Sequence, residues 1–265
     1  MNDVKSRYKQ YLDSEEGARK YNEFKDILYG KRDSLVVKLF GIIYPKLKGR
    51  DSLRVLDMGG GDGRRLMHLI RLFRAEGVRI EADLVEPSRT FTKNARKTVL
   101  ENGYTVRVER NTFEDFEPAD ARGYDLILSI HSIYTFRDDS YLKKVRGLLR
   151  PGGLAVFVVN DGSSFLGGLK RITDASYGTS RNEIDSLMRA LEGVPHRMLK
   201  FDTIFSGVSG AKGLNRKGNL ILEWIGMRPL SDIPMEVRVQ AARFFARRTR
   251  GGSIREKEVV VMVGN

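Results

Sequence analysis

Short apolar runs alternate with amphipathic stretches through the middle of the chain. The apolar runs are residues 53–57, 80–87, 105–110, 125–131 and 154–160, and the stretches with helical spacing between them are 64–75, 89–101 and 140–149. Apolar runs of this length are typical of strands buried on both faces, and strands that alternate with helices form parallel sheets with right-handed crossovers. The pattern therefore predicts an α/β fold built on a doubly wound parallel sheet.

The first 50 residues follow a helical pattern instead. Tyr8, Tyr11 and Leu12 stand at i, i+3 and i+4, the spacing of one helix face. We expect two or three helices in residues 1–50. They would form an N-terminal helical cap or lid ahead of the main domain, residues 51–265.

The alternation loosens toward the end of the chain. A turn is expected at Pro151-Gly152-Gly153, and the Gly- and Ser-rich residues 161–181 are expected to be partly a mobile loop. Beyond it, the pattern predicts helices at 182–191, 220–226 and 235–247 and strands at 197–204 and 258–263. Insertions at about 161–195 and 205–250 are expected to add to the cap.

The composition excludes several classes of protein. The chain has 265 residues, of which 41% are hydrophobic and 31% charged, with no cysteine and three histidines. These values fit a folded chain with one large domain. The absence of cysteine excludes disulfides and thiolate catalysis, and the scattered histidines predict no metal site. Because the longest apolar stretches, 154–159 and 259–263, have only strand length, we expect a soluble cytoplasmic protein without a membrane partner.

The net charge of +13 raises the alternative of an anionic partner such as RNA. Lys and Arg are spread along the chain, however, and are densest at 137–150 and 243–257. Charge runs of this kind are most often solvated surface. A nucleic acid therefore stays an alternative partner that the charge alone does not favour.

A glycine-rich turn follows the first apolar run. The sequence Asp57-Met58-Gly59-Gly60-Gly61-Asp62-Gly63 leads into the helix predicted at 64–75. Such a turn at a helix N-terminus lets backbone N–H groups approach a nucleotide-like ligand, because no Cβ stands in the way. The third glycine of a dinucleotide fingerprint would fall at Arg64, and no Lys-Ser/Thr pair follows Gly63. A nicotinamide cofactor is therefore disfavoured and a phosphate-binding P-loop is excluded.

The spacing D-x-G-x-G-x-G, at Asp57, Gly59, Gly61 and Gly63, resembles motif I of class I S-adenosylmethionine-dependent methyltransferases. The resemblance implies a Rossmann-like sheet of about seven strands, mostly parallel, with a C-terminal antiparallel hairpin strand. It also implies S-adenosylmethionine as the cofactor and S-adenosylhomocysteine as the product. The carboxylate of Asp57 can receive the amino end of this zwitterionic cofactor, directly or through water.

Residues at other strand ends extend the expected cofactor site. Glu86 closes the second strand, where a carboxylate can accept hydrogen bonds from both ribose hydroxyls, although a solvated strand-end Glu would look the same. Asn111 and Thr112 follow the third strand, where this fold places the adenine, and Phe113 can pack on the ring, although such a turn needs no ligand. The expected cofactor-binding residues are Asp57, Gly59, Gly60, Gly61, Gly63, Glu86, Pro87, Ser88, Asn111, Thr112, Phe113, Ser129 and Ile130.

Within this superfamily the chain is most similar to the histamine N-methyltransferase-like group. The similar segments are Tyr8–Glu16, Val85–Ser88, His131–Tyr134, Val158–Ser164 and Lys217–Trp224. The likeness implies a small-molecule acceptor held between the carboxyl edge of the sheet and the cap. It puts the family's substrate carboxylate near Glu15, Glu16 or Gly17, so that either Glu15 or Glu16 can hold a cationic amine. The histamine enzymes carry a polar amide where this chain has His131, so the likeness implies a shared architecture rather than a shared substrate.

The chemistry of methyl transfer sets what the remaining residues must do. Displacement at a sulfonium methyl is in line, so most of the catalysis can come from holding the nucleophile close to the methyl carbon. An imidazole titrates near neutrality, so His131 can take a proton from an acceptor amine while Tyr134 orients it; packing or a backbone hydrogen bond is the alternative role for His131. Tyr134, Tyr21 and Trp224 can line an aromatic pocket for a cation, with core packing as the alternative for each.

Three functions remain open at this point. The first is methyl transfer to a small molecule, at an amine nitrogen, and the second is methylation of RNA or protein through the basic surface. Against the second, the fourth strand ends in Ser129-Ile130-His131-Ser132 and not in the Asn/Asp-Pro-Pro-aromatic sequence of many nucleobase amine methylases. The third is a non-catalytic binding module on the same scaffold, which the intact glycine turn and Glu86 disfavour. The sequence favours the first function.

Overall fold

The computed structural model of the chain describes residues 13–30, 33–133, 136, 140–177, 183–208 and 213–264. Within them the strands are β1 (Ser52–Met58), β2 (Arg79–Val85), β3 (Val106–Glu109), β4 (Tyr124–Ile130), β5 (Leu149–Asn160), β6 (His196–Ser206) and β7 (Ser253–Gly264). The helices are α2 (Glu15–Tyr29), α3 (Ser34–Leu47), α4 (Arg64–Ala75), α5 (Arg89–Asn102), α6 (Tyr141–Leu148), α7 (Phe165–Tyr177), α8 (Glu183–Ala190), α9 (Arg216–Gly226) and α10 (Met235–Arg248), with a 3-10 turn at Leu230–Asp232. None of the helices in this described part of the chain combines the length and apolarity needed to cross a membrane. The helical spacing at Tyr8, Tyr11 and Leu12 lies outside the described residues.

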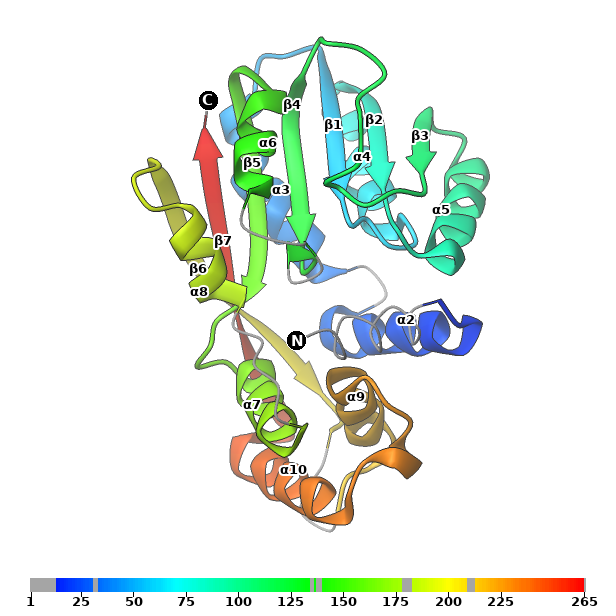
Figure 1. The fold of residues 1–265 in the computed structure, drawn as a ribbon, viewed down its shortest axis with the longest axis vertical. Helices are drawn as coiled ribbons and strands as arrows, with labels where there is room; N and C mark the ends of the chain where they lie inside the picture. The colour runs from blue at the N-terminus through cyan, green and yellow to red at the C-terminus, as the bar shows by residue number, and fades with distance from the viewer. Residues whose placement is uncertain are drawn as a thin grey trace. The chain divides into compact units, whose positions relative to one another are not determined.

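The seven strands form one sheet in the order β3-β2-β1-β4-β5-β7-β6 (Figure 1). β2 pairs in parallel with β1 and β3, and β4 pairs in parallel with β1 and β5. β7 is antiparallel, and its arrow in Figure 1 points opposite to those of β4 and β5. The predicted Rossmann-like α/β sheet, mostly parallel with a C-terminal antiparallel strand, is confirmed. Its strand order reverses between β1 and β4, and open α/β sheets bind ligands beside the carboxyl ends of the strands at such a point.

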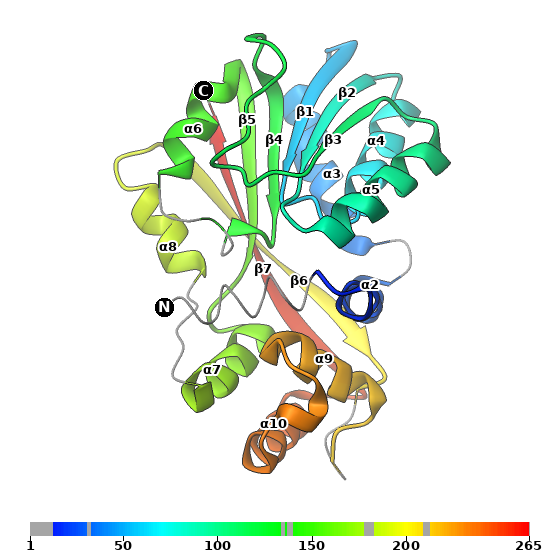
Figure 2. The same ribbon diagram turned by 45° about the vertical axis from the view of Figure 1, so that its right-hand side comes forward.

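The apolar pattern explains how the helices cover the sheet. Residues of β4 from Tyr124 to Ser129 are all buried, as expected for a strand with both faces covered. Figures 1 and 2 show α4 and α5 beside β1 to β3 and α6 beside β5. Apolar residues three and four positions apart line one side of a helix. In α4 the buried residues include Leu66, Met67, Leu69, Ile70 and Phe73.

The chain divides into two compact units. The first comprises residues 1–34, 160–182 and 200–259, and the second comprises residues 35–159, 183–199 and 260–265. α2, α7, α9 and α10 belong to the first unit, in which α7 packs against α9 and α10 and α2 packs against α9. β1 to β4 and α3 to α6 belong to the second unit. α3, which falls within the residues 1–50 expected as a cap, therefore groups with the sheet.

The prediction that residues 161–181 are partly a loop missed a helix, because residues 165–177 form α7, and residues 178–181 lie outside the described residues. Ser164 Oγ accepts a hydrogen bond from the N–H of Gly167 at 2.9 Å and so caps the start of the helix. A Cβ on Gly168 would clash with the ring of Phe244 in α10. Glycine here permits close packing of two helices, and its presence was mistaken for a loop signal.

The turn expected at Pro151-Gly152-Gly153 is also wrong, because these residues lie inside β5. β5 pairs with Tyr124 of β4 through Leu149 and with Leu126 through Leu154, and the register shifts between the two pairs. Such an irregularity takes up extra residues without ending the strand. It also accommodates a proline, which has no N–H to donate to a neighbouring strand.

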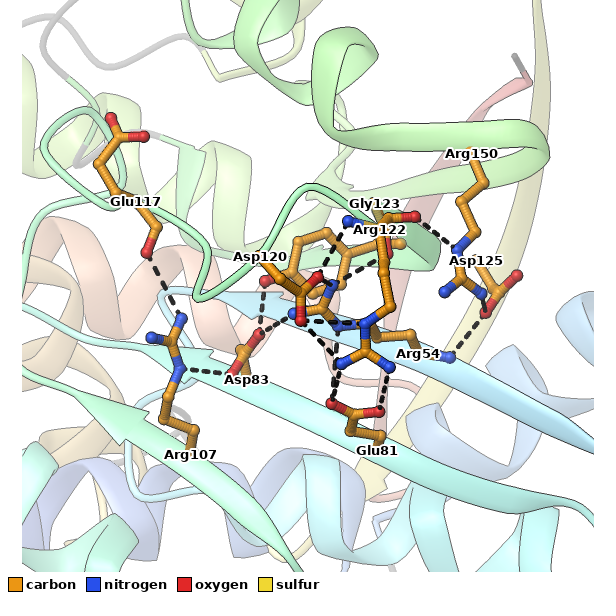
Figure 3. A network of polar contacts seen from close by, with 11 residues as sticks. Arg54, Glu81, Asp83, Arg107, Glu117, Asp120, Arg122, Gly123, Asp125 and Arg150 are labelled. Atoms are coloured by element: carbon orange, nitrogen blue, oxygen red, sulfur yellow. Dashed lines mark hydrogen bonds and ion pairs between the residues drawn. The ribbon is translucent and has the colours of Figure 1, made fainter.

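Residues 110–123, which connect β3 to β4, contain no helix. A network of charged side chains joins this connection to the neighbouring strands (Figure 3). Arg54 of β1 is 4% exposed, donates a hydrogen bond to Asp120 at 2.6 Å and lies 3.6 Å from Asp83 of β2. Asp83 also accepts hydrogen bonds from Arg107 of β3, at 2.8 Å, and from the hydroxyl of Tyr124. Side chains from four strands and the connection are thus joined by ion pairs and hydrogen bonds.

Two buried glutamates join the three chain segments of the first unit. Glu256 and Glu258 lie two residues apart on β7, so they point to the same face, and both are 0% exposed. Glu256 accepts hydrogen bonds from the side chain of Asn160 at 2.9 Å and from the N–H of Leu166 at 2.8 Å. Glu258 accepts one from the hydroxyl of Tyr29 at 2.9 Å. Burial, and secondarily the charge of Glu258, raises the pKa of Glu256 to about 8.

We expect the protein to lose stability as the pH rises from about 4.5 to about 8. In this window the folded chain holds a proton on Glu256 that the unfolded chain releases, so rising pH favours unfolding. Glu256→Gln does not titrate, and its Tm should change less with pH than that of the wild type. Exposed Glu192→Gln should keep the wild-type pH dependence. Differential scanning calorimetry across the window tests this, and equal slopes for the wild type and Glu256→Gln would contradict it.

Candidate functional site

Three glycines in the turn after β1 have left-handed backbone conformations. The φ angles are +71° at Gly59, +59° at Gly61 and +75° at Gly63. Residues with a side chain rarely adopt this conformation, so the alternating glycines of the motif stand where the chain needs them. The N–H groups of Gly59 and Gly60 donate to the carbonyl of Val85 at 2.8 and 3.3 Å. These bonds fix the turn against the end of β2.

The turn also makes contacts that leave no room for side chains. A Cβ on Gly59 would lie 2.5 Å from the Cβ of Ser132, which follows β4. A Cβ on Gly60 would lie 2.6 Å from Cγ of Leu84 and 2.7 Å from Oδ2 of Asp57. Asp57 itself is 3% exposed at the end of β1. The turn is therefore enclosed by β1, β2 and the end of β4.

Glu86 connects the glycine turn to the start of α5. Its buried carboxylate accepts hydrogen bonds from the N–H of Gly61 through Oε2, at 3.0 Å, and from the N–H of Ser88 through Oε1, at 2.9 Å. Ser88 in turn caps α5 by accepting a bond from the N–H of Phe91 at 3.2 Å, and Pro87 is exposed. Each carboxylate oxygen can accept more than one hydrogen bond. Glu86 therefore holds the glycine turn against the start of α5.

The turn after β3 is shaped by its own polar side chains. Asn111 accepts a hydrogen bond from the N–H of Thr112 at 2.9 Å and donates one to the carbonyl of Asp115 at 3.0 Å. The hydroxyl of Thr112 donates to the carboxylate of Asp115 at 2.8 Å. Phe113 is 2% exposed. The two side chains expected to bond an exocyclic amine are thus engaged within the turn.

Two serines link the ends of β1 and β4. The hydroxyl of Ser129, which is fully buried, lies 2.7 Å from that of Ser132. Ser132 donates to the carbonyl of Met58 at 2.6 Å, and Ile130 is partly exposed at the end of β4. Sequence reasoning missed Ser132, for which the only signal was its position next to His131. These bonds join the two strands between which the strand order reverses.

His131 has a left-handed backbone conformation, with φ of +57°. Its N–H donates to the carbonyl of Val158 in β5 at 2.9 Å, and its side chain is partly exposed. Holding a non-glycine residue in this region costs on the order of 1–3 kcal/mol, and such residues gather at functional sites. The strain at the carboxyl end of β4 therefore supports a functional role for His131.

Glu15 and Glu16 form the exposed first turn of α2, in the first unit. Ser14 caps this helix by accepting a hydrogen bond from the N–H of Gly17 at 2.9 Å. Acidic side chains in the first turn interact favourably with the helix dipole. Lys20 lies 3.1 Å from the carboxylate of Glu16, and hydrogen bonding to it lowers the pKa of Glu16. Both carboxylates therefore already stabilise α2.

Tyr21 of α2 and Trp224 of α9 come together in the first unit. Their ring centroids are 4.5 Å apart, and the ring of Phe24 lies 5.7 Å from that of Trp224. The ammonium of Lys25 lies 4.5 Å from the centroid of the Tyr21 ring. The three rings thus pack on one another, and the cation that lies against the Tyr21 ring is the ammonium group of Lys25. Tyr134 lies outside the described residues.

The groups around the end of β1 define the ligand that they can hold. The glycine turn leads directly into the N-terminus of α4, and the dipole of a helix favours a negatively charged group at that end. Asp57 and Glu86 are carboxylates, which accept hydrogen bonds from ammonium and hydroxyl groups. A ligand with an amino-acid end and a ribose matches this set. Among the described residues, no group of His, Cys, Asp and Glu could hold a metal ion.

Comparison with known proteins identifies the family of this fold. A family model described as a methyltransferase domain matches residues 30–199. A non-reducing polyketide synthase of Stereocaulon alpinum is 28% identical over 106 residues, 40% of this chain, and the match spans only 4% of the length of that relative.

Two solved structures have a similar fold. The YcgJ protein of Bacillus subtilis has a TM-score of 0.59 at 17% identity, over 86% of this chain and 98% of its own. Phosphoethanolamine N-methyltransferase 2 of Haemonchus contortus, solved with phosphomonomethylethanolamine and S-adenosylhomocysteine, has a TM-score of 0.58 at 14% identity, over 97% of this chain and 59% of its own. With the family model matching more than half of its length, the chain belongs to the methyltransferase-domain family, and its sheet has the class I methyltransferase fold.

Proposed function

We propose that this chain is an S-adenosylmethionine-dependent methyltransferase that acts on a small molecule, at an amine nitrogen, and releases S-adenosylhomocysteine. The observation that carries the proposal is the glycine turn after β1, with three left-handed glycines and the buried carboxylate of Glu86 bound to the N–H of Gly61. It lies beside the point where the strand order reverses. Family membership supports the same activity.

The residues of this site fit the cofactor group by group. Glu86 would accept hydrogen bonds from the ribose hydroxyls, and Asp57 would receive the ammonium group. The turn after β3, with Phe113, would hold the adenine, and Ser129 and Ile130 would border the site at β4. Gly59, Gly60, Gly61, Gly63, Pro87 and Ser88 would shape it through the backbone. When bound, S-adenosylmethionine supplies a methyl group activated by its sulfonium.

The acceptor side of the proposal rests on His131 and on the residues that the family likeness assigns to the substrate. An imidazole at the end of β4 can accept the proton of an amine that arrives protonated, and Tyr134 would orient that amine. Residues 1–50 and the insertions at about 161–195 and 205–250 would contribute the substrate cap, with Glu15 or Glu16, Tyr21 and Trp224 as candidate contacts. The histamine N-methyltransferase-like grouping belongs to this proposal. A neighbour in fold that is an amine N-methyltransferase supports an amine acceptor.

RNA is a less favoured acceptor because β4 runs into Ser129-Ile130-His131-Ser132 and not into an Asn/Asp-Pro-Pro-aromatic sequence, and because some of the arginines are already paired within the protein. The arginines that form ion pairs with aspartates or glutamates of the chain include Arg50, Arg54, Arg107, Arg122 and Arg150. Paired guanidinium groups contribute less to the attraction of a phosphate backbone than unpaired ones.

Calorimetric titration with S-adenosylhomocysteine tests the cofactor. The wild type should bind it, and Glu86→Gln should bind it on the order of tenfold more weakly, because the amide cannot accept both N–H bonds and loses the charge that strengthens them. Glu101→Gln, an exposed change in α5, serves as the matched control. Failure of the wild type to bind would overturn the methyltransferase proposal and favour the non-catalytic alternative.

An acceptor screen with methyl-labelled S-adenosylmethionine tests the second half of the proposal. Small primary, secondary and tertiary amines, RNA and protein are offered in parallel. Label transfer to an amine supports the proposed acceptor class. Transfer to RNA or protein alone would replace it while leaving the methyltransferase assignment intact.

A further inference from the structure

The turn after β3 is held by a lysine that the proposed function does not use. The connection of residues 110–123 contains no helix, so backbone hydrogen bonds of its own hold little of it in place. Its later half is tied to the sheet by Arg54, which pairs with Asp120, and by Arg107, which donates to the carbonyl of Glu117 (Figure 3). Its earlier half, which includes Phe113, has a different anchor.

That anchor is Lys144 of α6, a helix that follows β4 in the chain. Its ammonium donates to the carbonyl of Glu114 at 2.9 Å and to the carbonyl of Phe116. It also lies 3.6 Å from the carboxylate of Glu117 and 5.6 Å from the centroid of the Phe113 ring. One side chain, 24% exposed, thus contacts four residues of the turn.

These contacts are suited to fixing a conformation. Hydrogen bonds from a charged donor are stronger than neutral ones, and two of them converge on carbonyls two residues apart. The ammonium near the aromatic ring adds a weaker attraction. Phe113 is further held by Phe136, whose ring centroid lies 5.6 Å away. Without the ammonium, the carbonyls of Glu114 and Phe116 would have to find other donors, and the turn would gain freedom.

We infer that Lys144 is a positioning residue for the cofactor: it fixes the turn that would receive the adenine, without touching the cofactor itself. The inference rests on the proposed function, because it presumes that the turn after β3 borders the cofactor. A turn that is already ordered loses less conformational entropy on binding, so the anchor acts on affinity. Sequence alone gave no sign of this role, since Lys144 reads as one of many lysines on a helix.

The experiment is calorimetric titration of S-adenosylhomocysteine into the wild type and three variants. Lys144→Met keeps the length of the side chain but removes the donors, and it should weaken binding on the order of tenfold. Lys144→Arg can still donate to two carbonyls and should restore most of the affinity. Lys143→Met removes the same charge from the adjacent exposed position of α6 and should bind like the wild type.

Hydrogen–deuterium exchange and Tm complete the test. In Lys144→Met the amides of residues 111–117 should exchange faster, while Tm stays close to that of the wild type. If the wild type binds the ligand and Lys144→Met binds equally well, this inference fails and the proposed function stands. If the wild type does not bind, the proposed function itself fails. A loss of affinity that Lys144→Arg does not restore would also overturn the positioning role.

Discussion

Gly59→Ala is expected to weaken binding of S-adenosylhomocysteine by at least about tenfold, because two physical effects act on the turn at once. The backbone at Gly59 has φ of +71°, where an L residue costs about 1–2 kcal/mol. The added Cβ would also lie 2.5 Å from the Cβ of Ser132, and overpacking of this kind typically costs about 1–3 kcal/mol. Relief of that contact must move the glycine turn or the end of β4.

Gly77→Ala separates the two effects. Gly77 has a similar φ of +80°, but a Cβ there would meet nothing within 4 Å. It should therefore lose about 1–2 kcal/mol of unfolding free energy from backbone strain alone and keep its affinity for the ligand. Gly59→Ala should lose more stability, together with the affinity.

A second substitution identifies the source of the clash. Ser132→Gly removes the Cβ that Gly59→Ala would meet. The double variant should therefore lose less unfolding free energy than the sum of the two single losses. Urea unfolding and calorimetric titration measure both quantities. Equal behaviour of Gly59→Ala and Gly77→Ala would show that the close approach of β1 and β4 does not matter for binding.

The features that sequence predicted well are those set by local physics. The helix at 64–75 has the same bounds in the structure as α4, because its apolar spacing and the preceding glycines act within a few residues. The glycine motif likewise marks positions where the backbone itself requires glycine. The strand order could be expected only through the family resemblance, since alternation predicts a parallel sheet but not which strand lies next to which.

The features that sequence missed depend on partners far along the chain. Gly168 was taken as part of a loop, but it stands where Phe244 of a distant helix approaches α7. Arg54 pairs with Asp120, 66 residues away, and nothing in the local pattern selects that partner. Lys144 was missed for the same reason. Asn111 and Thr112 bond within their own turn, as turn residues commonly do, and their contact with the cofactor stays a prediction.

Arg54→Met is expected to lower the free energy of unfolding by about 3–5 kcal/mol, the usual result of removing one partner from a buried ion pair. Arg54 is 4% exposed and Asp83 6% exposed, and their atoms lie 3.6 Å apart. The guanidinium also donates to Asp120 and lies 4.7 Å from the centroid of the Tyr124 ring. Methionine fills a similar length but leaves Asp83 with less compensation for its buried charge.

The size of this loss matters because a domain has only about 5–15 kcal/mol of net stability. Arg71→Met removes an exposed arginine that donates a hydrogen bond to Asn102 at 3.2 Å, and it should change the free energy of unfolding by less than about 0.5 kcal/mol. Asp83→Asn removes the charge that Arg54 compensates. The double variant Arg54→Met/Asp83→Asn should therefore lose less unfolding free energy than the sum of the two single losses. Urea unfolding with fitted m-values measures all four proteins. Purely additive losses would mean that the two side chains act independently. The stability of the fold near the connection of residues 110–123 would then not depend on their pairing.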